Sequence, residues 1–227
     1  MDNQKIGAVI VAAGESQRMG GVDKVMALLG GKPVLARTID VFQNCSAIDQ
    51  IVIVLSEQNL KPGKRLVAEQ GWSKVTGVCP GGRCRQDSVV AGLSRLKDCY
   101  WVVIHDGARP LLTEDLISRG LVEAKETGAA VAAVPVTDTI KAVGSDRIVY
   151  QTPPRQNLWA VQTPQVFRYH IIVEAYRRAK GEVTDDASLV EQMGGKVKLY
   201  MGSYDNIKIT TLDDLVLAEA LWQKHGK

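Results

Sequence analysis

Residues 6–24 read IGAVIVAAGESQRMGGVDK, an apolar run followed by a loop of small and polar residues. The run Ile6–Ala13 predicts a buried strand, and the chain leaves it at Gly14 for a loop that carries Arg18 and Lys24. Small residues let backbone N–H groups approach an anion closely, and open α/β sheets bind ligands at the carboxyl ends of their strands. Because Arg18 and Lys24 add two cations, the loop is suited to a polyphosphate.

Two common phosphate-binding loops do not fit this stretch. No Gly-Lys-Ser/Thr follows the glycines, which excludes a Walker A loop, and the missing Gly-x-Gly-x-x-Gly disfavours a dehydrogenase. Ala-Ala-Gly-x-Ser-x-Arg-Met, with a lysine six residues after the arginine, resembles the signature loop of sugar-nucleotide-type nucleotidyltransferases. A strand and turn with surface charges is the plainer interpretation. The combination of Gly14, Ser16, Arg18, Met19 and Lys24 favours the functional one.

Composition places the chain among ordinary globular proteins. Its 227 residues, 45% hydrophobic and 23% charged, suit one α/β domain over residues 1–227. A net charge of +3 without a Lys/Arg run does not support nucleic-acid binding. No apolar run reaches membrane-spanning length, and the polar start differs from a signal peptide, so we expect no membrane association and a cytoplasmic protein. The four cysteines form no Cys-x-x-Cys pair, so we expect free thiols rather than a zinc site.

Strand-like and helix-like stretches alternate up to Pro135. The expected strands are Ile6–Ala13, Ile51–Leu55, Lys74–Val78, Trp101–His105 and Ala129–Val134, and the expected helices are Pro33–Cys45, Asn59–Gln70, Gln86–Leu96 and Thr113–Thr127. Alternation of this kind predicts parallel βαβ units, and strands that are apolar throughout fit a sheet covered on both faces. We therefore predict an α/β fold with three α/β/α layers, Rossmann-like, around a mixed and mainly parallel sheet.

The alternation breaks after Pro135. Short β-like pieces at Thr139–Val143 and Arg147–Gln151 flank the turn signal Gly144-Ser145-Asp146 and predict a hairpin. Residues 137–160 are thus expected to form a protruding β-arm. Such short polar strands are poorly placed to fold alone, which favours packing against a second subunit. The later expected elements are helices at Tyr169–Lys180, Asp185–Met193 and about Leu212–Lys224 and a strand at Lys196–Met201.

Two polar clusters follow expected strands. Gly81-Gly82 allows close backbone approach and, together with Ser88, favours a nucleoside contact over a helix N-cap at Asp87 or Ser88. Asp106 lies in His105-Asp106-Gly107-Ala108-Arg109-Pro110, where an acid meets a ribose hydroxyl or a divalent ion, or else caps the next helix. His105 is expected to be a hydrogen-bonded core residue.

Later clusters carry less information one by one. Thr137–Lys141, Pro153–Gln156 and Gln162–Gln165 are typical of polar residues on edge strands. Thr184–Ser188 is typical of a helix start with acids near the positive end of the dipole. Lys208, within Asp205-Asn206-Ile207-Lys208-Ile209-Thr210, is typical of a solvated charge when taken alone.

Taken in order, the clusters resemble the 2-C-methyl-D-erythritol 4-phosphate cytidylyltransferase family of the non-mevalonate isoprenoid pathway, from about residue 6 to residue 219. The most specific parts are His-Asp-Gly-Ala-Arg-Pro, Asp-Thr-Ile-Lys, Leu-Trp-Ala-Val-Gln-Thr-Pro-Gln-Val-Phe, Thr-Asp-Asp-Ala-Ser and Asp-Asn-Ile-Lys-Ile-Thr. The resemblance implies transfer of CMP from CTP to the polyol phosphate, with release of pyrophosphate. It also implies Mg²⁺ or another divalent cation, held mainly by the CTP phosphates, and a homodimer with arm exchange.

The resemblance also implies roles for individual residues. The implied catalytic cations are Arg18, Lys24 and Lys208. The implied nucleotide-binding residues are Ala12, Ala13, Gly14, Ser16, Gly82, Ser88 and Asp106. The implied substrate-binding residues are Asp106, Arg109, Thr139, Arg155, Thr163 and Thr184, of which Thr139 and Arg155 enter the site of the partner subunit.

This chain departs from the family pattern at three places. Val25-Met26 replaces a glutamine and an aromatic residue, Gly107 replaces an alanine, and Arg83 stands where other members carry an acid. The Val-Asp-Lys sequence of the first loop also resembles molybdopterin guanylyltransferases. The alternatives are a ribitol-5-phosphate cytidylyltransferase, which shares most of the motifs, and a non-catalytic nucleotide-sensing domain, which would not need both Arg18 and Lys24. Cys84 is expected near the site, without an assigned role.

Overall fold

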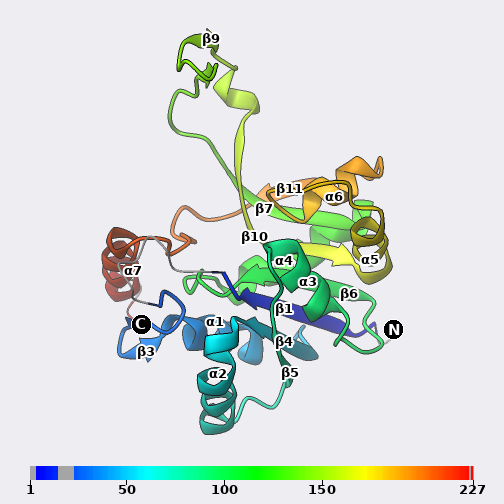
Figure 1. Ribbon diagram of the computed structural model, residues 1–227, viewed down its shortest axis with the longest axis vertical. Helices are drawn as coiled ribbons and strands as arrows, with labels where there is room; N and C mark the ends of the chain where they lie inside the picture. The colour runs from blue at the N-terminus through cyan, green and yellow to red at the C-terminus, as the bar shows by residue number, and fades with distance from the viewer. Residues whose placement is uncertain (1–3, 15–22, 225, 227) are drawn as a thin grey trace.

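One seven-stranded sheet organises the computed structural model, which describes residues 4–14, 23–224 and 226 (Figure 1). Its strands are β1 (Ile6–Ala12), β4 (Gln50–Leu55), β5 (Val75–Pro80), β6 (Trp101–Asp106), β7 (Ala129–Pro135), β10 (Trp159–Arg168) and β11 (Lys198–Met201). Their order across the sheet is β11-β7-β10-β6-β1-β4-β5. β10 runs antiparallel to both of its neighbours, and the other pairs are parallel. The expected mixed, mainly parallel sheet is confirmed.

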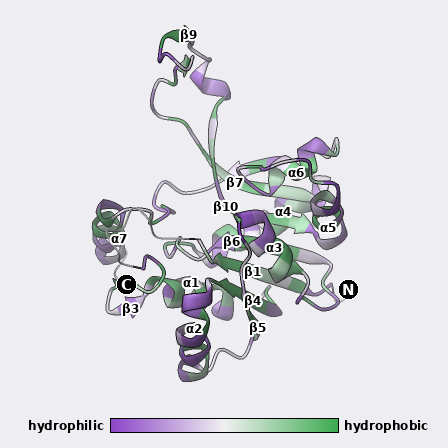
Figure 2. Cartoon of the chain, in the orientation of Figure 1, coloured by the Kyte–Doolittle hydropathy of each residue, from purple (hydrophilic) through white to green (hydrophobic). Residues whose placement is uncertain are grey.

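Helices cover both faces of the sheet, because its central strands present apolar side chains on both faces. The helices are α1 (Val34–Asn44), α2 (Glu57–Gln70), α3 (Arg85–Leu93), α4 (Glu114–Thr127), α5 (Tyr169–Arg178), α6 (Ala187–Gln192) and α7 (Leu212–Lys224). On β1, Ala8 and Ile10 pack with α1, α2 and α4, whereas Val9 faces α3, α5 and α6. Figure 2 shows the hydrophobic strands enclosed between helices with hydrophilic outer surfaces. The three-layer expectation is confirmed.

Strand β10 corrects one expectation from the sequence. Gln162–Gln165 do not lie on an edge strand: they belong to β10, which pairs with β6 on one side and β7 on the other. Gln162, Thr163 and Gln165 are at most 9% exposed. The register with β7 shifts between Val161 and Gln165, and such an irregularity interrupts the alternation by which a strand is recognised.

The segment between β7 and β10 projects from the sheet as an arm (Figure 1). It contains the two-stranded pair β8 (Ala142–Val143) and β9 (Val149–Gln151), followed by the short helix η1 (Arg155–Asn157). The protruding β-arm is therefore confirmed, with strands shorter than expected. Ile148 and Tyr150 are 67% and 72% exposed, so the arm presents apolar surface that its own chain leaves uncovered.

Two smaller features complete the chain. β2 (Leu28–Leu29) and β3 (Lys32–Pro33) form a hairpin that contacts α7. Among the helices of the described ranges, none combines the length and apolar character needed to cross a membrane.

Candidate active site

A cavity of about 490 Å³ opens where β1, β5 and β6 end. Parallel strands bring their carboxyl ends to one edge of a sheet, so loops far apart in sequence meet there. The cavity gathers eight residues that the resemblance assigns to catalysis or nucleotide binding, which are Ala12, Ala13, Gly14, Lys24, Gly82, Ser88, Asp106 and Lys208. Cys84 also lines the cavity, as expected from its position in the sequence.

The end of β1 holds a cation close to the main chain. The Lys24 Nζ lies 3.5 Å from the position that a Cβ on Gly14 would occupy. The neighbouring Asp23 anchors this part of the loop, because its carboxylate accepts from Val25 N (3.0 Å) and from Asn59 Nδ2 on α2 (2.5 Å). Lys24 therefore has a defined place at the strand end. Ser16 and Arg18, the other expected loop residues, lie outside the described residues.

Two glycines allow close approaches around the loop between β5 and α3. A Cβ added to Gly81 would lie 2.3 Å from that of Ala13, and one added to Gly82 would lie 2.1 Å from that of Asp87. Only glycine permits such approaches without a shift of the backbone. Ser88 is buried inside α3, where its Oγ accepts from Gly82 N at 3.2 Å, and the N-cap position of the helix is Cys84, whose side chain makes no cap hydrogen bond. The N-cap alternative for Asp87 or Ser88 is therefore wrong.

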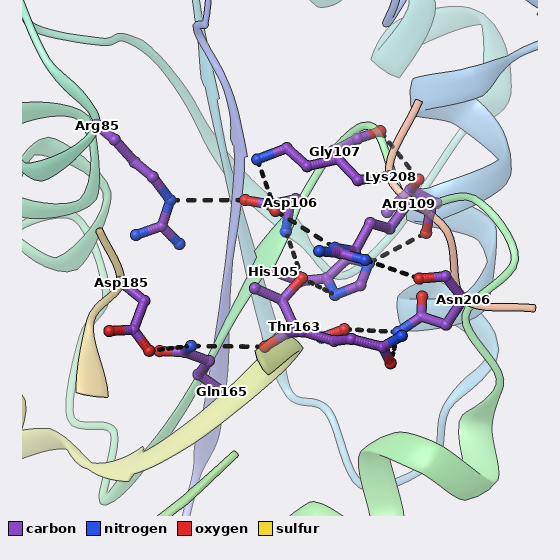
Figure 3. A network of polar contacts seen from close by, with 12 residues as sticks. Arg85, His105, Asp106, Gly107, Arg109, Thr163, Gln165, Asp185, Asn206 and Lys208 are labelled. Atoms are coloured by element: carbon purple, nitrogen blue, oxygen red, sulfur yellow. Dashed lines mark hydrogen bonds and ion pairs between the residues drawn. The ribbon is translucent and has the colours of Figure 1, made fainter. Parts of the chain in front are cut away.

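Asp106, at the end of β6, is the centre of a cluster of charges (Figure 3). Its carboxylate lies 3.0 Å from Lys208 Nζ, 3.4 Å from Arg109 Nε and 3.6 Å from Arg85 Nε. Burial by itself would raise the pKa of Asp106, but Lys208, Arg85 and Arg109 outweigh it and hold that pKa far below the usual range. Asp106 is therefore ionised. The expectation that Lys208, taken alone, is a solvated charge is wrong, because its ammonium pairs with the buried Asp106 carboxylate.

Arg85 is a residue of the cavity that the sequence reasoning missed. It lines the cavity and binds Asp186 through two parallel hydrogen bonds of 2.8 Å each. Asp186 is fully buried and also accepts from the Tyr176 hydroxyl. The capped helix start expected at Thr184–Ser188 is present, since Ser188 N donates to Asp185 Oδ1 at 3.2 Å, and the Arg85–Asp186 ion pair joins it to the cavity. The missed signal is an arginine at the first position of the helix that follows the glycine loop.

His105 and Thr163 support the turn that follows β6. The His105 ring is fully buried and lies within hydrogen-bond distance of Thr163 Oγ1 (3.0 Å) and Arg109 O (3.1 Å). Burial lowers the pKa of His105 to about 4, against smaller opposing effects of its hydrogen bond to Arg109 and of Asp106. The expectation of a hydrogen-bonded core histidine is confirmed. Thr163 Oγ1 also accepts from Asp106 N at 3.1 Å, so Thr163 reaches the cavity through Asp106.

Three expected substrate-binding residues are exposed and do not line the cavity within their own chain: Thr139, Arg155 and Thr184. Arg155 Nη1 donates to Thr137 O at 2.5 Å, so it is held within the arm. Arg109 does not line the cavity either, but it pairs with Asp106, which does, and its Nη1 donates to Asn206 O at 2.7 Å. Across the part of the chain that the structure describes, no three His, Cys, Asp or Glu side chains form a metal-binding cluster.

Comparisons with known proteins agree with this geometry. A model of the family of 2-C-methyl-D-erythritol 4-phosphate cytidylyltransferase, IspD, matches residues 6–224. Proteins of that name from Dehalococcoides mccartyi and Alkaliphilus oremlandii are 57% and 45% identical, over 98% and 97% of both chains. A structure of 4-diphosphocytidyl-2C-methyl-D-erythritol synthase from Anaerococcus prevotii has a TM-score of 0.87 at 32% identity, and the match covers 97% of this chain and 96% of that one.

The match of the family model and the identities extend over nearly the whole chain and confirm the family predicted from the ordered motifs. The arrangement of strands and helices agrees with the structural neighbours over the same length. This chain belongs to the 2-C-methyl-D-erythritol 4-phosphate cytidylyltransferase family, and it is a nucleotidyltransferase.

Proposed function

We propose that the cavity at the ends of β1, β5 and β6 is where this chain performs the reaction of its family, the transfer of CMP from CTP to 2-C-methyl-D-erythritol 4-phosphate. The observation that carries the proposal is the group of cations there. Lys24, Arg85 and Lys208 line the cavity. Arg109 pairs with the Asp106 carboxylate, which also binds Arg85 and Lys208. Both substrates are phosphate anions, which such a group attracts and orients.

The nucleotide is placed along the glycine-lined wall of the cavity. Gly82 and Ser88 are assigned to the cytidine, because the glycine leaves its main chain open to a close approach. Ala12, Ala13, Gly14 and the loop residue Ser16 are assigned to the triphosphate, next to the Lys24 ammonium. Asp106 is assigned to the ribose and to the positioning of the surrounding cations.

The chemistry requires positioning and charge neutralisation. A phosphate oxygen of the acceptor attacks the α-phosphorus of CTP in line, a new P–O bond forms, and the bond to the β-phosphate breaks to release pyrophosphate. Negative charge accumulates on the phosphoryl oxygens in the transition state, where fixed cations stabilise it most. Arg18, Lys24 and Lys208 are assigned to that charge, Arg109 and Thr184 to the acceptor, and Thr163 to the acceptor's side of the site through its bond to Asp106. No covalent enzyme intermediate is required.

A divalent cation such as Mg²⁺ is assigned to the phosphates of CTP. When bound, it would neutralise part of their charge. The described lining of the cavity offers one carboxylate, Asp106, and that carboxylate already pairs with three cations. Mg²⁺ is commonly held by substrate phosphates and waters. The cavity therefore fits an ion that is carried by the triphosphate better than an ion caged by the protein.

The arm is assigned to a homodimer. Its apolar side chains, including Ile148 and Tyr150, are exposed in the single chain, and covering them would stabilise the protein. Thr139 and Arg155 lie away from the cavity of their own chain. Exchange of the two arms in a twofold dimer would bring these residues to the cavity of the partner. We also assign the protein to the cytoplasm.

A pyrophosphate-release assay with purified protein tests the function. We expect turnover with CTP and 2-C-methyl-D-erythritol 4-phosphate that stops when EDTA removes divalent cations, and much less with ribitol 5-phosphate. An equal or higher kcat/KM with ribitol 5-phosphate would favour the ribitol enzyme. A preference for GTP would favour the guanylyltransferase resemblance of the first loop. Binding of CTP without turnover of any polyol phosphate would favour a nucleotide sensor.

A further inference from the structure

Asp106, which lines the cavity, and Arg109, which pairs with it, lie on one short turn whose main chain is hydrogen-bonded from beneath. Asp106 and Arg109 are three residues apart, at the end of β6. The Arg109 carbonyl lies 3.1 Å from His105 Nε2, and the Asp106 N–H donates to Thr163 Oγ1 at 3.1 Å. The Thr163 hydroxyl lies 3.0 Å from His105 Nδ1, which closes a chain of hydrogen bonds beneath the turn (Figure 3).

The partners of His105 determine its tautomer. A carbonyl oxygen only accepts, so the bond to Arg109 O requires a proton on Nε2. A neutral imidazole then carries no proton on Nδ1, which must accept from the Thr163 hydroxyl. The hydroxyl has one proton for this bond, and it accepts the Asp106 N–H separately through a lone pair of its oxygen. Each polar atom in these linked hydrogen bonds thus has one consistent role as donor or acceptor.

The surroundings leave the imidazole little freedom to move. His105 is fully buried, and its ring centroid lies 5.4 Å from that of Phe42 on α1. Thr38, also on α1, donates to Gly107 O at 3.1 Å and so supports the middle of the same turn. The charged groups near the imidazole are Asp106, Arg109 and Lys208, and all three belong to the charge cluster above the turn.

We propose that His105, as the neutral Nε2–H tautomer, is a positioning residue for the transfer reaction. It joins Thr163 on β10 to the main chain of Arg109 and thereby sets the places of the Asp106 carboxylate and the Arg109 guanidinium. His105 itself does not touch substrate, since it lies beneath the turn. The proposal rests on the proposed function of the cavity, and it assigns to Thr163 an effect that acts through Asp106 and His105.

The first test uses Thr163, because its variants keep the shape of the core. Thr163→Val is close to threonine in size and shape but lacks the hydroxyl, whereas Thr163→Ser retains the hydroxyl. Thr163→Val should lower kcat/KM for the polyol phosphate by roughly 10- to 100-fold, the usual effect of losing buried hydrogen bonds, with a smaller change in the Kd for CTP. Thr163→Ser should restore most of the loss. Equal losses in the two variants would contradict the proposal.

The second test asks whether the two residues act as a unit. His105→Phe keeps a ring in the core but makes neither hydrogen bond. If both residues act through one chain of hydrogen bonds, the double variant His105→Phe with Thr163→Val should be no worse than the poorer single variant. Losses that multiply would mean that Thr163 contacts substrate independently, and would overturn the proposal. His170→Phe, on the exposed surface of α5, is the matched control and should keep wild-type kinetics.

The tautomer is measured on the whole protein by ¹⁵N NMR of the imidazole nitrogens, which does not depend on turnover. We expect a protonated Nε2 and an unprotonated Nδ1 that stay unchanged between pH 8 and pH 6, and a shift of the Nδ1 resonance in Thr163→Val. A protonated Nδ1 in that range would overturn the proposal. If the spectrum agrees but the wild type shows no turnover of any polyol phosphate, the proposed function fails and the hydrogen-bond assignment stands.

Discussion

Asp186→Asn should destabilise the protein through a single buried ion pair. Asp186 is fully buried and binds both terminal nitrogens of Arg85 at 2.8 Å. An asparagine has one carbonyl oxygen to accept from the two guanidinium nitrogens, and its amide N–H groups would face an arginine N–H. Burial alone would lower the pKa of Arg85, yet Asp186 and then Asp106 hold it above the ordinary value. Arg85 therefore stays charged in the variant and loses its principal partner.

The expected cost follows from the burial of the two partners. Removing one partner of a buried ion pair costs about 3–5 kcal/mol. The Arg85 side chain is 28% exposed toward the cavity, so water can partly replace the lost carboxylate, and Asp106 remains 3.6 Å away. We therefore expect Asp186→Asn to lower the free energy of unfolding by about 3 kcal/mol, which for a chain of this size lowers the Tm by roughly 6–12 °C.

Differential scanning calorimetry at one protein concentration measures this loss. Asp115→Asn is the matched control, because Asp115 pairs with Arg119 at the same 2.8 Å but with 72% of its side chain exposed. Losing this exposed pair, together with a negative charge in the first turn of α4, should lower the free energy of unfolding by about 1 kcal/mol or less. Adding Arg85→Met to Asp186→Asn removes the unpaired charge and should recover much of the Tm.

Two results would refute this reasoning. If Asp186→Asn and Asp115→Asn lower the Tm equally, burial does not decide the strength of the pair. If the added Arg85→Met lowers the Tm further, the cost does not come from an unpaired guanidinium. Activity should remain low in the double variant despite its recovered stability, since Arg85 lines the cavity proposed for the nucleotide.

Four further outcomes are expected. Lys24→Ala should lower kcat by roughly 10²-fold or more with a smaller effect on the Kd for CTP, because a fixed cation acts most on the charge of the transition state; a change confined to KM would show simple phosphate binding. Mixing Lys24→Ala with Arg155→Ala subunits should restore activity up to about half of the wild-type level per heterodimer, since one shared site then carries neither change; confirmed heterodimers without activity would place Arg155 in its own site. Asn59→Ala should lower kcat in steady-state assays while global stability changes little, because it frees the Asp23 carboxylate that anchors the loop of Lys24; an unchanged kcat would contradict this. The pKa of His105 lies near 4 in the folded chain and near 6.5 in the unfolded one, so the unfolded chain binds the extra proton and stability falls on acidification. Urea unfolding at pH 7 and pH 5 should show a loss about 2 kcal/mol larger in the wild type than in His105→Asn, and equal losses would contradict it.

Local features of the sequence were sufficient to predict much of the fold and part of the site. Ile6–Ala13 is apolar throughout, which is the pattern of a strand buried on both faces, and the structure has β1 at Ile6–Ala12. Gly82 and Asp106 each follow an expected strand, and both line the cavity. Their positions follow from the common direction of parallel strands, which determines the edge at which these strands end, and the roles assigned to them stay predictions. The roles of Thr139 and Arg155 stay predictions.

The tertiary structure alone decided which distant residues meet. Arg85 and Asp186 are 101 positions apart, and His105 and Thr163 are 58 apart, so no local pattern connects them. The polar residues of β10 gave no sign of a central strand, because Gln162, Thr163 and Gln165 are buried only through partners on other elements. Local residue patterns specify the apolar strands and the small and charged residues at their ends. Which buried polar groups satisfy one another depended on packing, since a buried charge or hydrogen-bonding group is stable only where the fold supplies its partner.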